Sequence, residues 1–282
     1  MAGIIWLASY PKSGNTWARI FIENLLRDSD RPADINARKF FGVGEASAEW
    51  WRRVTDRPLR SMDTIAAAGL RPKVHLALTR LSPDNVVVKT HNALIEYAGV
   101  PQITTAVTAG AIYILRNPLD LCLSFADHFG VTVDRAIKMM ATEDLTSPST
   151  DDLAFEYLSS WSTHVESWTA SPHPRLLTVR YEDMQRAPVE TFGRIARHLG
   201  HAPSPERLLR AIENSSFGKL RAQEEEGGFV ERSENARRFF RVGASGQWQN
   251  QLTKLQIRRL IETHGETMRR FGYLDEEGTP VA

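Results

Sequence analysis

Short apolar runs alternate with amphipathic stretches along most of the chain, and this pattern predicts its secondary structure. Apolar residues dominate four segments that are too short for helices, and we expect buried strands at 3–9, 85–90, 111–115 and 175–180. Helical spacing follows the first strand and returns at 118–129, 151–168 and 188–199. Strands that alternate with such helices predict an α/β fold, a three-layer arrangement with a central parallel sheet of four to five strands flanked by helices.

The segment from about 215 to 249 shows no sustained periodicity and is predicted to be a long loop. A loop of this length in a compact domain is usually functional or disordered. The chain has no internal repeat and no linker-like stretch, so the sequence predicts one domain over 1–282, with 275–282 as a flexible tail.

Composition narrows the class of protein. Hydrophobic residues make up 42% of the 282 residues, and 35 Lys and Arg against 34 Asp and Glu give a net charge of +1. That balance argues against nucleic-acid binding by bulk charge. The single Cys122 forms no internal disulfide, which favours the cytoplasm. No apolar run reaches the roughly 18 residues of a membrane helix, and the start lacks the basic region of a signal peptide.

Polar residues follow directly after the predicted strands, where parallel sheets bind their ligands. The first strand leads into Lys12-Ser-Gly-Asn-Thr16 and then a helix. A glycine at such a turn, a helix N-terminus and a lysine together form a cradle for phosphate. The loop of nucleotide hydrolases has a different order, because there the lysine follows the glycine. The spacing alone also allows another interpretation, in which this segment is only a helix cap beside a surface lysine.

Four segments, in order along the chain, resemble the motifs of one known family. They are Tyr10-Pro-Lys-Ser-Gly-Asn-Thr-Trp17, Val88-Lys-Thr-His91, Tyr113-Ile-Leu-Arg-Asn-Pro-Leu-Asp120 with Ser124 beyond it, and Phe240-Arg-Val-Gly-Ala-Ser-Gly-Gln-Trp248. They are similar to the motifs of the cytosolic-type sulfotransferases that use 3′-phosphoadenosine 5′-phosphosulfate (PAPS). The resemblance runs from about residue 4 to 270.

The resemblance implies a role for each matching residue. His91 would be the general base, and Lys12, with Lys89, would stabilise the leaving adenosine 3′,5′-bisphosphate (PAP). The 5′-phosphosulfate would lie on Lys12, Ser13, Gly14, Asn15 and Thr16. The adenine would contact Trp17, Tyr181, Ser215 and Phe217. The 3′-phosphate region would include Arg116, Ser124, Arg241, Val242 and Gly243. No metal is implied.

Several positions depart from the family pattern. Val242, Gln247 and Gln249 stand where that family usually has lysine, aspartate and lysine, so the C-terminal element loses positive charge. Lys254 and Arg258 stand where valine and glutamate would complete the dimerisation motif of many animal members. An animal-type dimer is therefore not expected, and the oligomeric state stays open.

Two other classes of protein compete with this interpretation. A nucleotide kinase or hydrolase with a P-loop would need magnesium and the other glycine–lysine order. A binding protein of the same fold without catalysis would have no need to keep both Lys12 and His91. A zinc site at His198 and His201 lacks a third ligand. We therefore expect sulfuryl transfer to a hydroxyl or amine of a small-molecule acceptor: an alcohol, phenol, glycan, lipid or natural product.

The charged segment from about 221 to 241 is predicted to act as a gate over the cofactor and the acceptor. Its first half is acidic, its second half is basic, and Gly227-Gly228 lies between them as a hinge. Closure would bring Phe239 and Phe240 down as a lid and direct Arg237, Arg238 and Arg241 to the 3′-phosphate. The alternative is a solvated charged loop.

Overall fold

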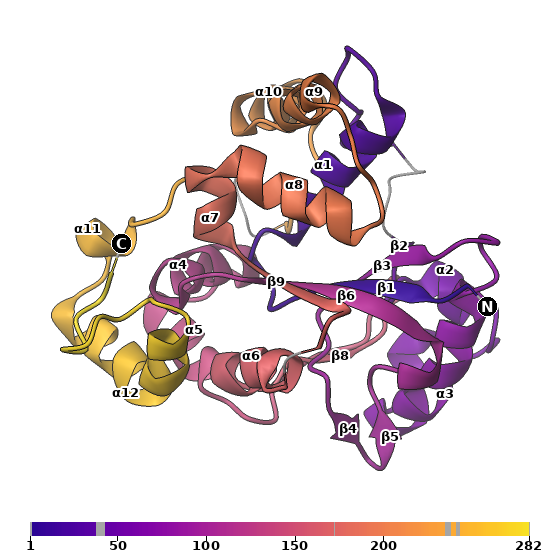
Figure 1. Cartoon of the computed structure of the whole chain (residues 1–282). Coiled ribbons are helices and arrows are strands. Elements are labelled where there is room, and N and C mark those ends of the chain that lie inside the picture. Colours follow the sequence, from indigo (N-terminus) through magenta and orange to yellow (C-terminus); the bar gives the residue numbers. More distant parts are fainter. Residues whose placement is uncertain (1, 38–42, 172, 235–237, 241–242, 282) are drawn as a thin grey trace. The chain divides into compact units, whose positions relative to one another are not determined.

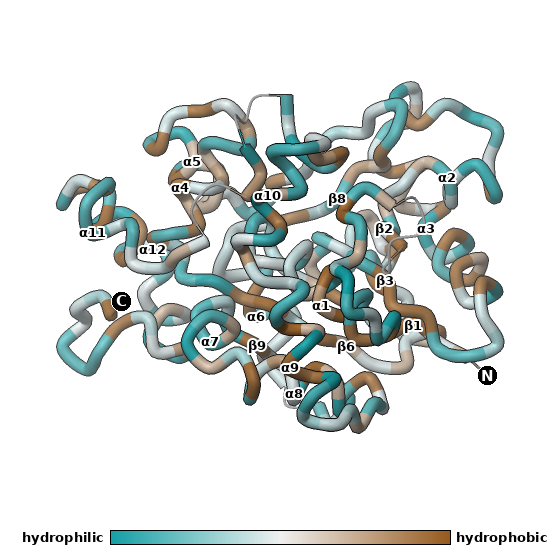
Figure 2. Tube along the Cα trace, turned by 90° about the horizontal axis from the view of Figure 1, so that it is seen from above, coloured by the Kyte–Doolittle hydropathy of each residue, from teal (hydrophilic) through white to brown (hydrophobic). Residues whose placement is uncertain are grey.

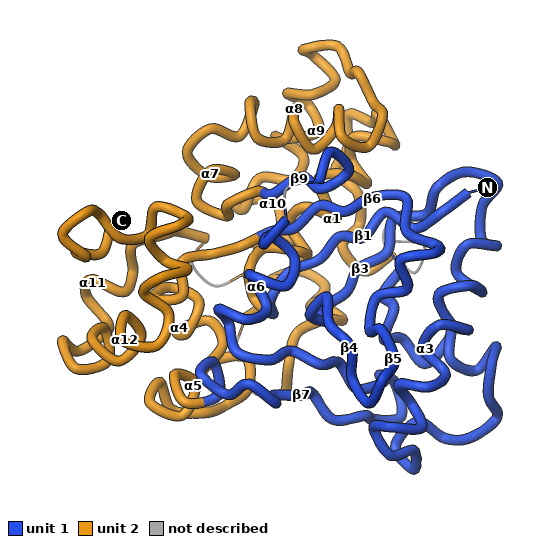
Figure 3. The backbone as a smooth tube through the Cα atoms, turned by 60° about the horizontal axis from the view of Figure 1, so that its bottom comes forward, with its two compact units in different colours: residues 1–11, 42–114, 139–178 blue, residues 12–41, 115–138, 179–282 orange. Residues whose placement is uncertain are grey.

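A computed structural model describes residues 2–37, 43–171, 173–234, 238–240 and 243–281. The chain forms two compact units, each assembled from separate stretches of sequence (Figure 3). Unit 1 contains residues 1–11, 42–114 and 139–178, and unit 2 contains residues 12–41, 115–138 and 179–282. Because each unit alternates with the other along the chain, neither corresponds to a consecutive domain, and the expectations of one domain and of a flexible tail stay predictions.

Unit 1 holds the whole or the larger part of the following elements: β1 (Ile4–Ser9), β2 (Val43–Gly44), α2 (Ala48–Trp51), η1 (Leu59–Ser61), α3 (Thr64–Leu78), β3 (Val86–Thr90), β4 (Glu96–Tyr97), β5 (Val100–Pro101), η2 (Thr105–Val107), β6 (Thr108–Leu115), β7 (Thr146–Ser147), β8 (Glu156–Tyr157), α6 (Trp161–Thr169) and β9 (Leu176–Arg180). Its five-stranded sheet has the order β2-β3-β1-β6-β9 (Figure 1). Strand β1 runs parallel to β3 and β6, and β2 runs parallel to β3. The four predicted strands and the parallel sheet are confirmed.

Two helices of unit 1 pack on one face of this sheet. The register of β1 and β6 places Trp6 and Tyr113 on the same face. The Trp6 ring lies 4.8 Å from the His75 ring of α3, and the Tyr113 ring lies 6.0 Å from the Trp168 ring of α6. Figure 2 shows the hydrophobic residues concentrated along β1 and β6, which explains why the sheet is identifiable from its apolar runs.

The helix predicted at 151–168 is wrong in its first half. Glu156 and Tyr157 form β8, which pairs with β7 in an antiparallel hairpin. Helix α6 begins only at Trp161, where the Ser160 hydroxyl accepts a hydrogen bond from the backbone of Thr163. Ser159 adopts a left-handed backbone with φ of 58°, which ends the preceding segment. The apolar spacing in the sequence therefore ran across a hairpin and a helix.

Unit 2 is built mainly from helices: α1 (Asn15–Arg27), α4 (Pro118–Phe129), α5 (Val133–Met140), α7 (Tyr181–Arg186), α8 (Pro188–His198), α9 (Pro205–Asn214), α10 (Phe217–Gly227), α11 (Trp248–Gln251) and α12 (Lys254–Arg270). The helices predicted after the first strand, at 118–129 and at 188–199 are confirmed. In α4 the Asn117 side chain accepts from the Leu119 backbone, and Pro118 occupies the first turn, where its missing N–H costs little.

The prediction of a long loop at 215–249 is wrong where α10 and α11 lie. Helix α10 buries Leu220 and Glu224, one turn apart, and only the first of these two residues is apolar. The Glu224 carboxylate instead accepts from the backbone N–H groups of Phe239 and Phe240, at 2.6 and 2.8 Å. A buried glutamate at a core position explains why no hydrophobic period was visible in the sequence.

Candidate functional site

The turn between β1 and α1 has a backbone that few residues adopt. Lys12 has a φ of 71° and Gly14 a φ of 102°, both in the left-handed region. A Cβ atom added to Gly14 would lie 2.6 Å from the Tyr181 ring, so only glycine fits there. Gly14 caps α1 without a side-chain hydrogen bond, and the first N–H groups of a helix attract anions.

Two hydroxyl groups belong to the same turn. The Ser13 hydroxyl is buried and has no hydrogen-bond partner among the described residues. A buried hydroxyl in that condition costs free energy unless a further group satisfies it, and a phosphate oxygen would do so. The Thr16 hydroxyl donates to the Glu231 carboxylate at 3.1 Å. The predicted phosphate loop thus fits an anionic ligand.

A pocket of about 370 Å³ lies beside this turn in unit 2. Trp17 and Tyr181 contribute two of its walls, and their ring centroids are 5.8 Å apart. The remaining lining residues are Gln185, Phe217, Gly243, Ala244 and Ser245. Three residues expected at the adenine, Trp17, Tyr181 and Phe217, therefore come together around one cavity with Gly243, which was expected at the 3′-phosphate.

Ser215, another residue expected at the adenine, lies buried behind Trp17. The Trp17 indole N–H donates to the Ser215 carbonyl at 2.8 Å. The Ser215 hydroxyl donates to the Ala211 carbonyl at 2.7 Å, and the Asn24 amide lies 3.3 Å from it. Ser215 therefore fixes the orientation of Trp17 and does not line the pocket.

Arg116 links the phosphate loop to the aromatic pocket. Its Nη1 donates to the Lys12 carbonyl at 3.1 Å, and its guanidinium lies 4.3 Å from the Tyr181 ring centroid. Ser124 is half-buried on α4, one turn after Asp120. Arg116 is therefore held between two of the predicted site residues.

The C-terminal motif is anchored by side chains that were assigned no role from the sequence. The Asp120 carboxylate accepts from the backbone N–H groups of Gly246 and Trp248, at 2.6 and 3.0 Å. The Gln185 amide donates to the Gly243 carbonyl. Gly243 has a φ of 64°, and a Cβ there would collide with the Phe217 ring. Arg241 and Val242 lie outside the described residues, as does Arg237.

His91, in unit 1, is hydrogen-bonded through its ring and both of its backbone groups. The His91 Nδ1 lies 2.7 Å from the Ser9 carbonyl, which only accepts, so Nδ1 carries the proton. The backbone N–H donates to the Glu156 carboxylate at 2.9 Å, and the backbone carbonyl accepts from His164 Nε2 at 3.0 Å. This arrangement makes Nε2 the basic nitrogen of a neutral His91.

Glu156 also interacts electrostatically with Lys89, the last but one residue of β3. Burial raises the pKa of the Glu156 carboxyl, although the nearby Lys89 ammonium acts in the opposite direction. Glu156 and His164 were not identified from the sequence, since each lies more than sixty residues from His91 and in no motif. The signal in that region was the motif Val88-Lys-Thr-His91, which contains neither residue.

His164 is itself held as a neutral imidazole. The Tyr113 hydroxyl lies 2.8 Å from His164 Nδ1, so the hydroxyl donates while Nε2 donates to His91. Burial lowers the pKa of His164 from 6.5 to about 4. A neutral histidine at this place keeps the His91 backbone fixed without adding a charge.

Within the described ranges, no group of three or more His, Cys, Asp and Glu side chains is arranged to hold a metal ion. None of the helices in that part of the chain is both long and apolar enough to cross a membrane.

Comparison with known proteins identifies the family. The sequence profile of the sulfotransferase domain matches residues 3–272. Dog sulfotransferase 1B1 is 27% identical over 261 residues, covering 89% of this chain and 79% of its own length. Flavonol 3-sulfotransferase of Flaveria bidentis is 26% identical over 277 residues, covering 91% of this chain and 78% of its own length.

Solved structures agree on the fold. Mouse sulfotransferase SULT7A1 complexed with PAP has a TM-score of 0.61 at 20% identity, over 98% of this chain and 86% of its own. Retinol dehydratase in a complex with retinol and PAP has a TM-score of 0.65 at 18% identity, and the match covers 95% of this chain and 82% of the dehydratase chain. The α/β fold predicted from the sequence is therefore confirmed, and the chain belongs to the sulfotransferase domain family.

Proposed function

We propose that this sulfotransferase uses PAPS and transfers its sulfuryl group to a hydroxyl or amine of a small molecule. The observation that carries the proposal is the pocket of Trp17, Tyr181, Phe217 and Gly243 beside a glycine turn with an unsatisfied Ser13 hydroxyl. An aromatic cavity suits a purine, and the adjoining turn suits the anionic group on its 5′ side. The relatives whose structures contain PAP support the same ligand.

His91 is assigned the general base. With Nδ1–H donated to the Ser9 carbonyl, Nε2 accepts the acceptor's proton as the acceptor oxygen or nitrogen forms its bond to sulfur. Bound PAPS supplies the activated sulfuryl group. Only Tyr10 and Pro11 separate Ser9, which orients His91, from Lys12 in the sequence.

Lys12 is assigned the stabilisation of the departing PAP. As the bond between sulfur and the bridging oxygen breaks, negative charge grows on that oxygen, and an ammonium group lowers its energy. Lys89 and the N–H groups at the start of α1 add to the positive potential. This chemistry belongs to the side chains and the backbone of the loop, and it uses no step through a metal.

The acceptor class is proposed from the relatives and from the His91 region. One relative is named as a flavonol sulfotransferase, and one structure contains retinol. Glu156 accepts a hydrogen bond from the His91 backbone and lies near Lys89, so the surroundings of the proposed base are polar, which suits a hydroxyl or amine of the acceptor. The single cysteine is buried, which suits a reducing compartment such as the cytoplasm.

The test compares nucleotides first and acceptors second. PAP should raise the melting temperature of the protein, whereas ATP with magnesium should have little effect. A sulfate-transfer assay with PAPS should then detect product with phenols, alcohols or amines. Stabilisation by ATP with magnesium and none by PAP would favour a nucleotide kinase or hydrolase, and PAP binding without transfer to any acceptor would favour a binding protein.

A further inference from the structure

An ion pair on the phosphate loop lies outside every predicted role. The Arg19 side chain, on the second turn of α1, is 5% exposed and its Nη2 lies 2.6 Å from both carboxylate oxygens of Glu231. The same Nη2 donates to the Thr16 hydroxyl at 3.1 Å, and that hydroxyl donates to Glu231. A carboxylate from a distant segment therefore binds a residue of the loop that is expected to bind phosphate.

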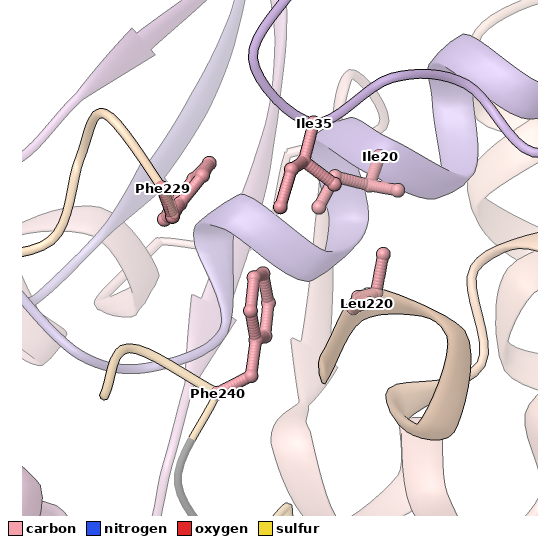
Figure 4. Close-up of a cluster of buried hydrophobic side chains, with 5 residues drawn as sticks. All are labelled: Ile20, Ile35, Leu220, Phe229 and Phe240. Carbon is pink, nitrogen blue, oxygen red and sulfur yellow. The ribbon is translucent and has the colours of Figure 1, made fainter. Parts of the chain in front are cut away.

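The segment that carries Glu231 is held against α1 by packing. Phe229 belongs to a buried cluster with Ile20, Ile35, Leu220 and Phe240 (Figure 4). The Asn36 side chain brackets the chain before Glu231, since its amide donates to the Gly228 carbonyl at 2.9 Å and its oxygen accepts from the Val230 N–H at 3.0 Å. These contacts position Glu231 independently of its charge.

The same segment contacts the lysine of the loop. The Lys12 ammonium lies 4.0 Å from the centroid of the Phe239 ring. Arg238, expected to reach a 3′-phosphate, instead pairs with Glu225 of α10 at 3.0 Å. The part of the predicted gate that the structure describes thus contacts Lys12 and Thr16, at the 5′ end of the proposed nucleotide site.

Hydrogen-bond arithmetic makes Glu231 and a phosphate mutually exclusive at Thr16. A threonine hydroxyl has one hydrogen, so it donates either to the Glu231 carboxylate or to a ligand oxygen. Two anions at one site also repel each other. We propose that Glu231 competes with the 5′-phosphosulfate for Thr16 and Arg19, which makes Arg19 a further cofactor-binding residue and Glu231 an internal competitor. This inference rests on the proposed function.

The competition has a consequence for turnover. On binding, the nucleotide takes over the hydrogen bonds of Thr16 and Arg19, and the Glu231 carboxylate moves away from the loop. On release, Glu231 returns to the same donors and so assists the departure of PAP. The affinity for the cofactor is therefore lower than it would be without the competing carboxylate. Glu231, which lies in none of the four motifs, sets the size of this reduction.

The test measures the dissociation constants of PAP and of adenosine 5′-phosphosulfate by calorimetry. Glu231→Gln keeps the shape of the side chain and removes its charge, and it should tighten both ligands roughly threefold to fivefold, the upper part of the range for a solvent-exposed ion pair. Glu226→Gln makes the same charge change at an exposed site on α10 and should leave both constants unchanged.

A second pair of variants identifies the group being competed for. In an Arg19→Gln background, Glu231→Gln should improve binding less than twofold, because the contested cation is gone. Should the Arg19 variant fail to fold, the comparison of Glu231→Gln with Glu226→Gln decides alone. Unchanged or weaker binding by Glu231→Gln, or an equal gain from Glu226→Gln, overturns the inference while PAP binding by the wild type upholds the proposed function. A wild type that binds neither nucleotide refutes both.

Discussion

Lys12 and His91 are assigned the chemistry of one reaction, yet they are held in opposite ways. Lys12 lies in a turn whose shape depends on left-handed backbone at Lys12 and Gly14, and Arg116 binds its carbonyl. His91 follows β3 directly and has no left-handed backbone. It is fixed by Ser9, Glu156 and His164 through hydrogen bonds to its ring, N–H and carbonyl. One site depends on backbone conformation, and the other depends on buried polar side chains.

The difference shows where functional information lies in a sequence. A backbone that requires glycine leaves a local signature, because Gly14 must stand at a fixed distance from Lys12 and from the start of α1. A histidine fixed by distant partners leaves none beyond its own neighbours. The two regions should therefore respond differently to substitution.

The largest expected effect separates catalysis from cofactor binding. His91→Gln should lower the turnover rate 10²–10⁴-fold, the usual loss when a general base is removed. The dissociation constant of PAP should change less than twofold, because the base is assigned to the acceptor and has no proposed contact with the nucleotide. Rates with PAPS and calorimetry with PAP measure the two quantities, and His201→Gln, at an exposed histidine, is the matched control. Weaker PAP binding by a folded His91→Gln protein would contradict the assigned role.

A smaller effect is expected on nucleotide binding when Arg116 is replaced, and it should differ between ligands with and without a 3′-phosphate. Arg116→Ala should weaken PAP binding roughly tenfold to hundredfold, because a charge-assisted bond to phosphate is worth about 1.5–3 kcal/mol. Adenosine 5′-phosphosulfate should weaken less, since it loses only the support that Arg116 gives to the Lys12 carbonyl and Tyr181. Titrations of both ligands measure the difference, with Arg186→Ala, an exposed arginine, as the control. Equal losses for the two ligands would remove Arg116 from the 3′-phosphate.

The smallest effect concerns stability around His91. The folded-state pKa of His164 is about 4, below the unfolded value of 6.5. Its neutral form therefore contributes stability that is complete above pH 6.5 and declines as the pH falls toward 4. Between pH 8 and pH 5 the contribution of His164 to the free energy of unfolding should fall by about 2 kcal/mol in the wild type. The His164→Asn protein should not show this part of the pH dependence. Urea unfolding at both pH values measures it. If the free energy of unfolding changed equally with pH in the two proteins, the pKa of His164 would be the same in the folded and unfolded states.

Much of unit 1 and of the phosphate loop could be predicted from the sequence. Apolar runs such as Val86–Val88 identify strands because both faces of a parallel strand are buried, and Pro118 marks the first turn of a helix. The spacing of Lys12, Gly14 and Thr16 identifies the loop because each position has a steric or charge requirement.

The missed features share a physical cause. Glu224 occupies a core position of α10 as a hydrogen-bond acceptor, and Asp120 anchors the C-terminal motif from a helix on which it reads as an ordinary first-turn acid. In each case a polar side chain binds backbone N–H groups of a segment far along the chain. Such pairing depends on the tertiary fold and has no period in the sequence.

The left-handed backbone of Lys12 places stability and the proposed activity in opposition at one residue. A residue with a side chain loses roughly 1–2 kcal/mol in that conformation relative to glycine. Replacement of Lys12 by glycine would therefore relax the turn while removing the ammonium group, so the variant would gain stability as it lost activity. The conformation at this position therefore sets the stability of the turn against the proposed role of the ammonium group.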